Sequence, residues 1–236
     1  MHGLNAYAAQ LGALEDEVRR RMYLFIRDRG RPVSREDAAR AVGISRKLAA
    51  FHLDKLVDKG LLKAHYARPP GRTGPGAGRP AKLYEPSDLE IEVSIPERHY
   101  DLVGHILVGA VANRSSEESP AEAALRHATE TGESLGREVR RARGLHPAGA
   151  ERALSVAGEV LGQHGFEPCQ APDGEVTLRN CPFHALAQEA PELVCGINRA
   201  FVDGLLRGLG NKNVEAALEP EPGRCCVKLR PPEARR

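Results

Sequence analysis

The stretch that decides the fold spans residues 34–62 and reads SREDAARAVGISRKLAAFHLDKLVDKGLL. Ser34 with Asp37 three positions later is typical of a helix cap, with the acid at the positive end of the helix dipole. These residues predict a short helix over residues 35–41. Residues 42–44 (VGI) fit a tight turn, so a second helix can begin directly afterwards.

Ser45 can cap this second helix, which is predicted to end at Gly60. Its apolar residues are spaced three and four positions apart and predict one buried stripe, formed by Ala49, Leu53, Leu56 and Val57. The opposite face is basic, which gives the order helix, turn, basic helix. The N-terminal side chains of such a helix can reach base edges in the major groove of DNA.

This basic helix supplies most of the candidate DNA contacts. Arg46 and Lys47 suit pairing with guanine, and Phe51 suits contact with a thymine methyl group. The predicted contacts from this helix are Ser45, Arg46, Lys47, Ala50, Phe51, His52 and Lys55.

The residues on either side complete the first domain. Before the capped helix, apolar residues at helical spacing predict one helix over residues 11–29. After it, residues 61–67 and 80–85 are expected to be two strands joined by a Gly- and Pro-rich loop. This hairpin would form a wing whose basic residues suit phosphate or minor-groove contacts, namely Arg68, Arg72, Arg79 and Lys82.

Charge is distributed unevenly along the chain, although the net charge of all 236 residues is only +2. Residues 1–88 hold 17 Lys and Arg against 10 Asp and Glu, whereas the remainder holds 17 against 22. The basic part is therefore the candidate for binding a polyanion. The alternative is a small helical domain with a solvated basic face, but capped helix, glycine turn, basic helix and basic wing occur together and favour DNA binding.

The first third resembles the ArsR-like winged-helix transcriptional regulators. The residues that carry this resemblance are 45–47 (SRK), 52–56 (HLDKL), 60–62 (GLL), 78–80 (GRP) and 83–84 (LY). The resemblance implies a recognition helix, a wing and double-stranded DNA as the partner. These motifs identify the superfamily but not the signal to which it responds.

The middle of the chain is predicted to be helical. In residues 99–112 the apolar side chains cover more than one helix face, so this helix should be buried on two sides. The second side could be covered by a second copy of the chain, because operator-binding winged helices usually need two-fold symmetry. This helix could equally be a central helix in the core of the C-terminal domain. A further helix is expected from Pro120 to about Arg143.

Four of the five cysteines lie in the last 56 residues. Cys181 is expected near the cap of a helix over residues 183–189, and Cys195 in the first or second turn of a helix that begins at Pro191. Cys225 and Cys226 fall in a predicted strand, residues 223–229. Adjacent strand residues point to opposite faces, so only one should face a shared site, with Cys226 slightly favoured.

Three cysteines and a fourth group could hold zinc or an iron–sulfur cluster. The predicted ligands are Cys181, Cys195 and Cys226, and the fourth position stays open among His184, Cys225, Cys169 or an exogenous ligand. Taken alone, Cys169 is better explained as a small buried hydrophobe. The spacing of these cysteines in the sequence does not identify the metal, because none of them forms a standard CxxC pair.

The cysteine segments resemble the C-terminal motif of SufR-type repressors. The matching residues are 180–184 (NCPFH), 193–196 (LVCG) and 222–227 (PGRCCV). The resemblance implies a homodimeric repressor that carries an iron–sulfur cluster, 4Fe–4S or 2Fe–2S, controls iron–sulfur biogenesis genes and changes operator affinity with cluster state.

The sequence thus predicts an α+β protein: a winged helix-turn-helix domain (1–88), a connector with dimerisation helices (89–143) and a cysteine-bearing sensor domain (144–236). In the alternative interpretation the chain still has the DNA-binding domain, but its cysteines hold a structural zinc ion or act as a thiol–disulfide switch. An enzyme using Cys195 with His184 or His164 ranks third, because no triad spacing or nucleophile elbow supports it. Without a leader or an 18-residue apolar stretch, a cytoplasmic, non-membrane protein is expected.

Overall fold

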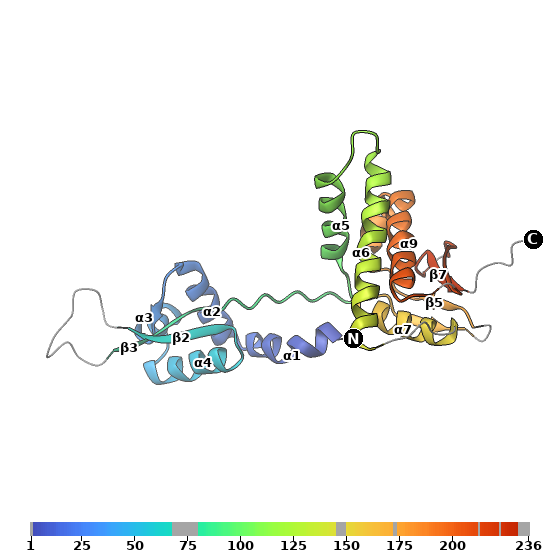
Figure 1. Ribbon diagram of the computed structural model, residues 1–236. Helices are drawn as coiled ribbons and strands as arrows, with labels where there is room; N and C mark the ends of the chain where they lie inside the picture. Colours follow the sequence, from blue (N-terminus) through green and yellow to red (C-terminus); the bar gives the residue numbers. More distant parts are fainter. Residues whose placement is uncertain are drawn as a thin grey trace, which may run out of the picture. The chain divides into compact units, whose positions relative to one another are not determined.

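The computed structural model describes residues 2–67, 80–144, 150–171, 174–211, 213–221 and 223–230, without the side chains of 2–6, 150, 151 and 153 (Figure 1). The chain divides into two compact units, residues 1–93 and 94–236. The predicted α+β class is confirmed, with a helix-turn-helix at the N-terminus and a small sheet in the second unit. Within the described residues, no helix is both long and apolar enough to cross a membrane.

The first unit packs helices against a small antiparallel sheet with strand order β1-β3-β2. Its buried core includes Met22, Ile26, Leu53, Leu56 and Tyr84. The elements are α1 (His2–Glu15), α2 (Glu17–Arg29), β1 (Val33–Ser34), α3 (Arg35–Val42), α4 (Arg46–Asp58), β2 (Leu62–Ala67) and β3 (Ala81–Pro86).

Local capping fixes the helix-turn-helix. The Ser34 side chain accepts a hydrogen bond from Asp37 N at 3.2 Å, and the Ser45 side chain accepts one from Leu48 N at 3.2 Å. Between the two helices, Gly43 adopts φ of +78°, a left-handed conformation that glycine reaches without a steric penalty. Both predicted helices are confirmed to within a residue or two at each end.

Two predictions for this unit need correction. The single helix expected over residues 11–29 is two helices, because Asp16 caps the second one by accepting from Arg19 N at 2.9 Å. Strand β1 was not expected, since its two residues are too few for a periodic pattern. The predicted hairpin is present, but Arg68, Arg72 and Arg79 lie outside the described residues.

The second unit combines five helices among its described residues with an antiparallel sheet of strand order β4-β5-β7-β6. Figure 1 shows α6 and α9 side by side, and these two helices form its main helix pair. The elements are α5 (Tyr100–Ala112), α6 (Pro120–Ala142), α7 (Ala150–Gln163), β4 (Pro168–Gln170), β5 (Val176–Leu178), α8 (His184–Glu189), α9 (Pro191–Gly208), β6 (Glu215–Leu218) and β7 (Val227–Arg230).

Helices α6 and α9 approach so closely that their backbones touch at four glycines. A Cβ placed on Gly132 or Gly136 of α6 would overlap backbone atoms of α9, and the same holds for Gly204 and Gly208 of α9 against α6. Small residues one turn apart are what allow such an approach. The stability of the second unit therefore depends on the absence of side chains at these four positions.

Helix α5 buries one face and exposes another. Val103, Ile106 and Ala110 are buried in the core of the second unit. Val108 and Val111 are 70% and 79% exposed. The second side that the sequence predicted to be covered is thus open in the single chain.

Candidate DNA interface and thiol site

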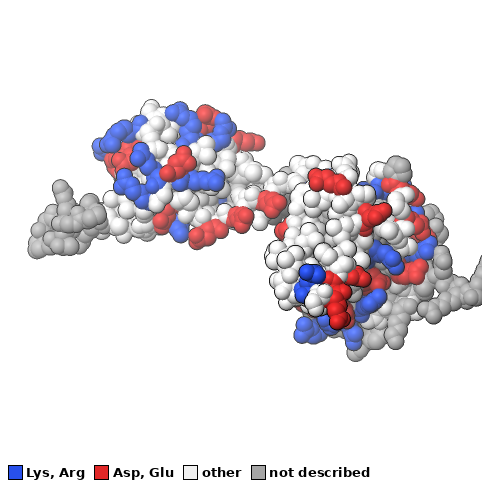
Figure 2. All heavy atoms as spheres, turned by 90° about the horizontal axis from the view of Figure 1, so that it is seen from above, with Lys and Arg blue, Asp and Glu red and all other residues white. Residues whose placement is uncertain are grey.

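The face of α4 that was predicted to contact DNA is exposed. Arg46, Lys47 and Lys55 are exposed, and so is Phe51 at 55%. Figure 2 shows Lys and Arg side chains gathered over much of the face of the first unit that it presents. A basic surface of this kind supplies the sequence-independent attraction to the phosphate backbone.

Three other predicted contacts on α4 take up different positions. Ser45 is exposed, but its hydroxyl oxygen is engaged in the helix cap. Ala50 is only partly exposed. His52 is 6% exposed, with its Nδ1 atom 4.0 Å from Asp16 Oδ1, so its prediction as a DNA contact was wrong. The reason is helical geometry, because position 52 lies one turn from the buried Ala49 and Leu56.

Lys82 of the hairpin is engaged within the first unit. Its Nζ atom lies 2.7 Å from Asp54 Oδ1 on α4, and the Tyr84 hydroxyl group also donates to Asp54 at 3.2 Å. The hydrogen bond that Lys82 donates to Asp54 raises the pKa of Lys82. These contacts hold the hairpin against α4. We therefore assign Lys82 a structural role, in addition to any contact that it makes with DNA.

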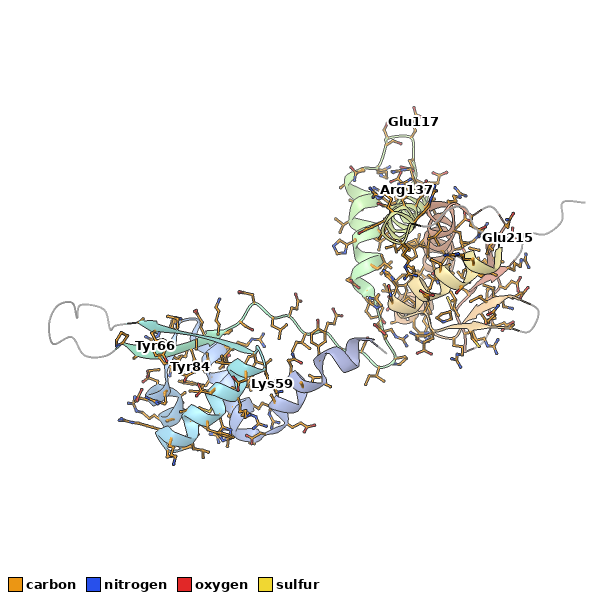
Figure 3. The ribbon with its side chains drawn as sticks, turned by 60° about the horizontal axis from the view of Figure 1, so that its bottom comes forward. Lys59, Tyr66, Tyr84, Glu117, Arg137 and Glu215 are labelled. Atoms are coloured by element: carbon orange, nitrogen blue, oxygen red, sulfur yellow. The ribbon has the colours of Figure 1, made fainter. Side chains whose placement is uncertain are left out.

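Two exposed residues near this surface were missed by the sequence reasoning. Leu48, in the first turn of α4, is 43% exposed, and Tyr66, near the end of β2, is 65% exposed. Figure 3 labels Tyr66 and Tyr84 on the same hairpin, although Tyr84 is buried. Leu48 could have been recognised from the sequence, because it is an apolar residue that lies next to Arg46 and Lys47 and outside the predicted buried stripe.

Strand pairing in the second unit brings the distant cysteines together. Strand β5 pairs antiparallel with β7, with Val176 opposite Leu229. The residues that follow β5 therefore lie beside those that precede β7, and Cys225 N donates to Leu178 O at 2.9 Å. Cys181 follows β5, Cys225 and Cys226 precede β7, and α9 packs on this part of the unit with Cys195 in its second turn.

The four thiols lie near one another. Those of Cys181 and Cys225, of Cys225 and Cys226, and of Cys226 and Cys195 are close enough to interact. Cys225 and Cys226 both take part because they lie in a bend before β7 rather than within the strand. Strand alternation, on which the expectation that only one of them faces the other cysteines was based, does not apply at these two positions. We call Cys181, Cys195, Cys225 and Cys226 the thiol site.

Burial and mutual contact favour protonated thiols in the metal-free protein. The hydrogen bond with Cys225, together with burial, raises the pKa of Cys181. For Cys225 the Cys181 hydrogen bond acts to lower the pKa, but the Cys226 hydrogen bond and burial outweigh it and raise the pKa to about 11. Burial likewise raises the pKa of Cys195. A metal ion would reverse this preference, because it binds the thiolate and releases the proton.

Several N–H groups point at these sulfurs. The backbone N–H groups of Phe183 and Val227, each two residues after a cysteine, lie near the Cys181 and Cys225 thiols. Asn198 of α9 is fully buried, and its Nδ2 donates to Cys225 Sγ at 3.0 Å. Such donors stabilise negative charge on sulfur and are the means by which proteins tune thiolate-bound metal centres. Asn198 was missed, although it is the polar residue within an otherwise apolar helix face.

The two remaining candidates lie apart from the thiol site. His184 is exposed, and no described contact links its side chain to a cysteine thiol. Cys169 lies in β4, the edge strand of the sheet, where Thr177 Oγ1 donates to its carbonyl oxygen at 3.2 Å.

The chemistry of the thiol site fits a thiolate-bound metal centre. Among the described residues, no group of three or more His, Cys, Asp or Glu side chains is arranged to hold a metal ion, so the thiols would have to rearrange to bind one. Four soft sulfur donors in one place match the Cys₄ sets of zinc and iron–sulfur centres. Cys225 and Cys226 are buried, whereas Cys181 and Cys195 are partly exposed, so a group bound here would be reachable from solvent.

Comparison with known proteins bears on the first unit. Residues 14–64, which span α2, α3, α4 and the start of β2, match a family described as a helix-turn-helix domain. No curated protein matches the chain. Together with the exposed basic face of α4, the match shows that the first unit is a helix-turn-helix domain of the kind found in DNA-binding transcriptional regulators.

Proposed function

We propose that this protein is a homodimeric, winged-helix transcriptional repressor of the SufR type, whose affinity for its operator depends on an iron–sulfur cluster held by the thiol site. The helix-turn-helix domain supports the DNA-binding part. The proximity of Cys181, Cys195, Cys225 and Cys226, brought about by the pairing of β5 with β7 and by α9, is the observation that supports the sensing part.

Partial exposure favours a sensing role over a purely structural one. Cys181 and Cys195 are within reach of solvent, so oxidants or iron-scavenging molecules could reach a cluster bound to them. When bound, the cluster supplies redox chemistry and links α9, β7 and the loop after β5. The chain's own residues provide the thiolates and the N–H donors from Phe183, Asn198 and Val227.

A zinc site is the second candidate, because four cysteine thiols also match the Cys₄ ligand set of a tetrahedral zinc ion.

Anaerobic purification separates these candidates. We expect a brown protein with equal amounts of iron and sulfide, and gel-shift affinities that differ between loaded and metal-free protein on a duplex selected by the wild type. A colourless protein with one zinc per chain would establish the second candidate instead. Equal affinities of loaded and metal-free protein would rule out sensing by this site.

The exposed face of α5 supports the dimer. Leu107, Val108 and Val111 are exposed apolar residues on consecutive turns, and a two-fold operator requires two recognition helices. We expect Val108→Asp to convert the dimer into a monomer, because a charge would be buried without a partner. Light scattering would measure the mass. Leu24→Asp, which alters an exposed leucine of α2, should remain dimeric, and a dimeric Val108→Asp protein would exclude α5 as the interface.

For the recognition helix, we expect Lys47→Ala to weaken operator binding and to reduce the slope of log K against log salt by about 1, since one phosphate contact is lost. Lys59→Ala is the matched control. It removes the same charge about 18 Å farther along the helix axis, at the other end of α4 (Figure 3). Fluorescence anisotropy over a salt series would measure both, and equal slopes for the two variants would contradict the proposed orientation of α4 on DNA.

A further inference from the structure

The segment with which the second unit begins is hydrogen bonded to the loop that carries Cys181. Arg98 Nη1 donates to the carbonyl oxygen of Cys181 at 2.9 Å and also to the side-chain oxygen of Asn180. His99 N donates to Pro182 O at 3.2 Å. Arg98 and Cys181 are 83 positions apart in the sequence, so these bonds are a tertiary connection and not a local turn.

Asn180 strengthens this connection from the other side. It is 7% exposed, and its Nδ2 donates to Glu97 O at 2.8 Å and to Gly165 O. Gly165 has φ of +77°, and a Cβ placed on it would lie 3.0 Å from the His99 ring. The loop, the turn after α7 and residues 97–99 are therefore closely fitted to one another.

Arg98 also brings a positive charge to the thiol site. It is half-buried, and the acceptors described for its guanidinium are neutral oxygens of Glu97, Asn180 and Cys181. Its charge acts to lower the pKa of Cys181, against the larger effects of the Cys225 hydrogen bond and burial. A metal centre bound by several thiolates carries net negative charge, which a nearby guanidinium stabilises.

We propose that Arg98 is a positioning residue of the thiol site, which holds the Cys181 loop ready to bind metal and connects that loop to residues 94–99. This proposal rests on the proposed function, because it requires the thiol site to bind a metal centre. Residues 94–99 directly follow the first unit in sequence. Metal binding at Cys181 would thus affect residues 94–99, the segment that follows the DNA-binding unit in the sequence.

The test uses full-length protein and zinc as the probe, since zinc binds thiolate sites whichever metal they hold in the cell. Affinity is measured by competition with a chromophoric chelator. We expect Arg98→Gln to weaken zinc binding by roughly 10- to 100-fold, as for other residues that position metal ligands. Arg98→Lys should recover part of this loss, because it keeps the charge. Arg179→Gln is the matched control, since Arg179 is exposed and adjacent to the same loop.

A second measurement reports the connection itself. Hydrogen–deuterium exchange at residues 94–99 should slow when zinc binds to the wild type and should not change in Arg98→Gln, with folding of both checked by circular dichroism. Wild-type zinc affinity in Arg98→Gln would overturn the positioning role while leaving the metal site intact. A wild-type protein that binds neither zinc nor an iron–sulfur cluster would overturn the proposed function as well.

Discussion

A Cys181→Ser protein is expected to bind none of the proposed iron–sulfur cluster, with no visible absorption and no acid-labile sulfide after anaerobic purification. Serine is a hard oxygen donor with a much higher pKa than a thiol, so it does not replace a thiolate for iron or zinc. Cys181 lies near Cys225, and its carbonyl oxygen accepts a hydrogen bond from Arg98 Nη1 at 2.9 Å, so its loop is held in place beside the other thiols.

Cys169→Ser is the control for this change. Cys169 has the same chemistry but lies in β4, away from the thiol site, so its replacement should leave iron, sulfide and colour unchanged. If both serine variants retained the cluster, the thiol site would not be its ligand set. If both lost it, a general sensitivity of the second unit to cysteine replacement would explain the result better than ligation.

The largest expected effect on stability is that of Gly132→Ala. The new methyl group would overlap the carbonyl oxygen of Phe201 and lie 2.8 Å from Leu205 N, both backbone atoms of α9. Backbone cannot move aside as a flexible side chain does, so α6 and α9 must separate. We expect a loss of more than about 3 kcal/mol, beyond the usual range for overpacking, and this outweighs the gain of about 1 kcal/mol in helix propensity.

Gly158→Ala provides the matched comparison. Gly158 also lies inside a helix, α7, but an added Cβ would meet only the Pro168 side chain at 3.8 Å, an ordinary contact. This variant should be unchanged or stabilised by up to about 1 kcal/mol. Thermal denaturation measures both, and the Gly132→Ala melting temperature should fall by roughly 10 °C. Similar melting temperatures for the two variants would contradict the close contact of α6 with α9.

The first unit was predictable to a large extent because its signals are local. Ser34 and Ser45 each cap a helix by bonding to an N–H three residues away, so the pattern in the sequence and the bond in the structure concern the same few atoms. The exposed basic face of α4 followed from helical spacing. His52 was the error, since it lies at the border between the buried stripe and the exposed face, where spacing alone does not decide.

The thiol site was predictable in composition but not in geometry. Clustering of cysteines near the C-terminus pointed to the right residues, yet their arrangement depends on the pairing of β5 with β7, whose paired residues are about 50 positions apart. Because β7 begins at Val227, Cys225 and Cys226 precede the strand and are not subject to its alternation. Nothing in the neighbouring sequence marks where β7 begins, because its extent is set by β5 and β6.

The sequence by itself determined the helix-turn-helix, the boundaries of α3 and α4 and the cysteines worth examining, because capping bonds and apolar periodicity act over a few residues. Only the tertiary structure decided that four thiols lie near one another, that Asn198 donates to Cys225 Sγ and Arg98 to the carbonyl oxygen of Cys181, and that four glycines let α6 and α9 touch. These features join residues far apart in the chain. Such contacts arise from how whole elements pack, which no short segment encodes.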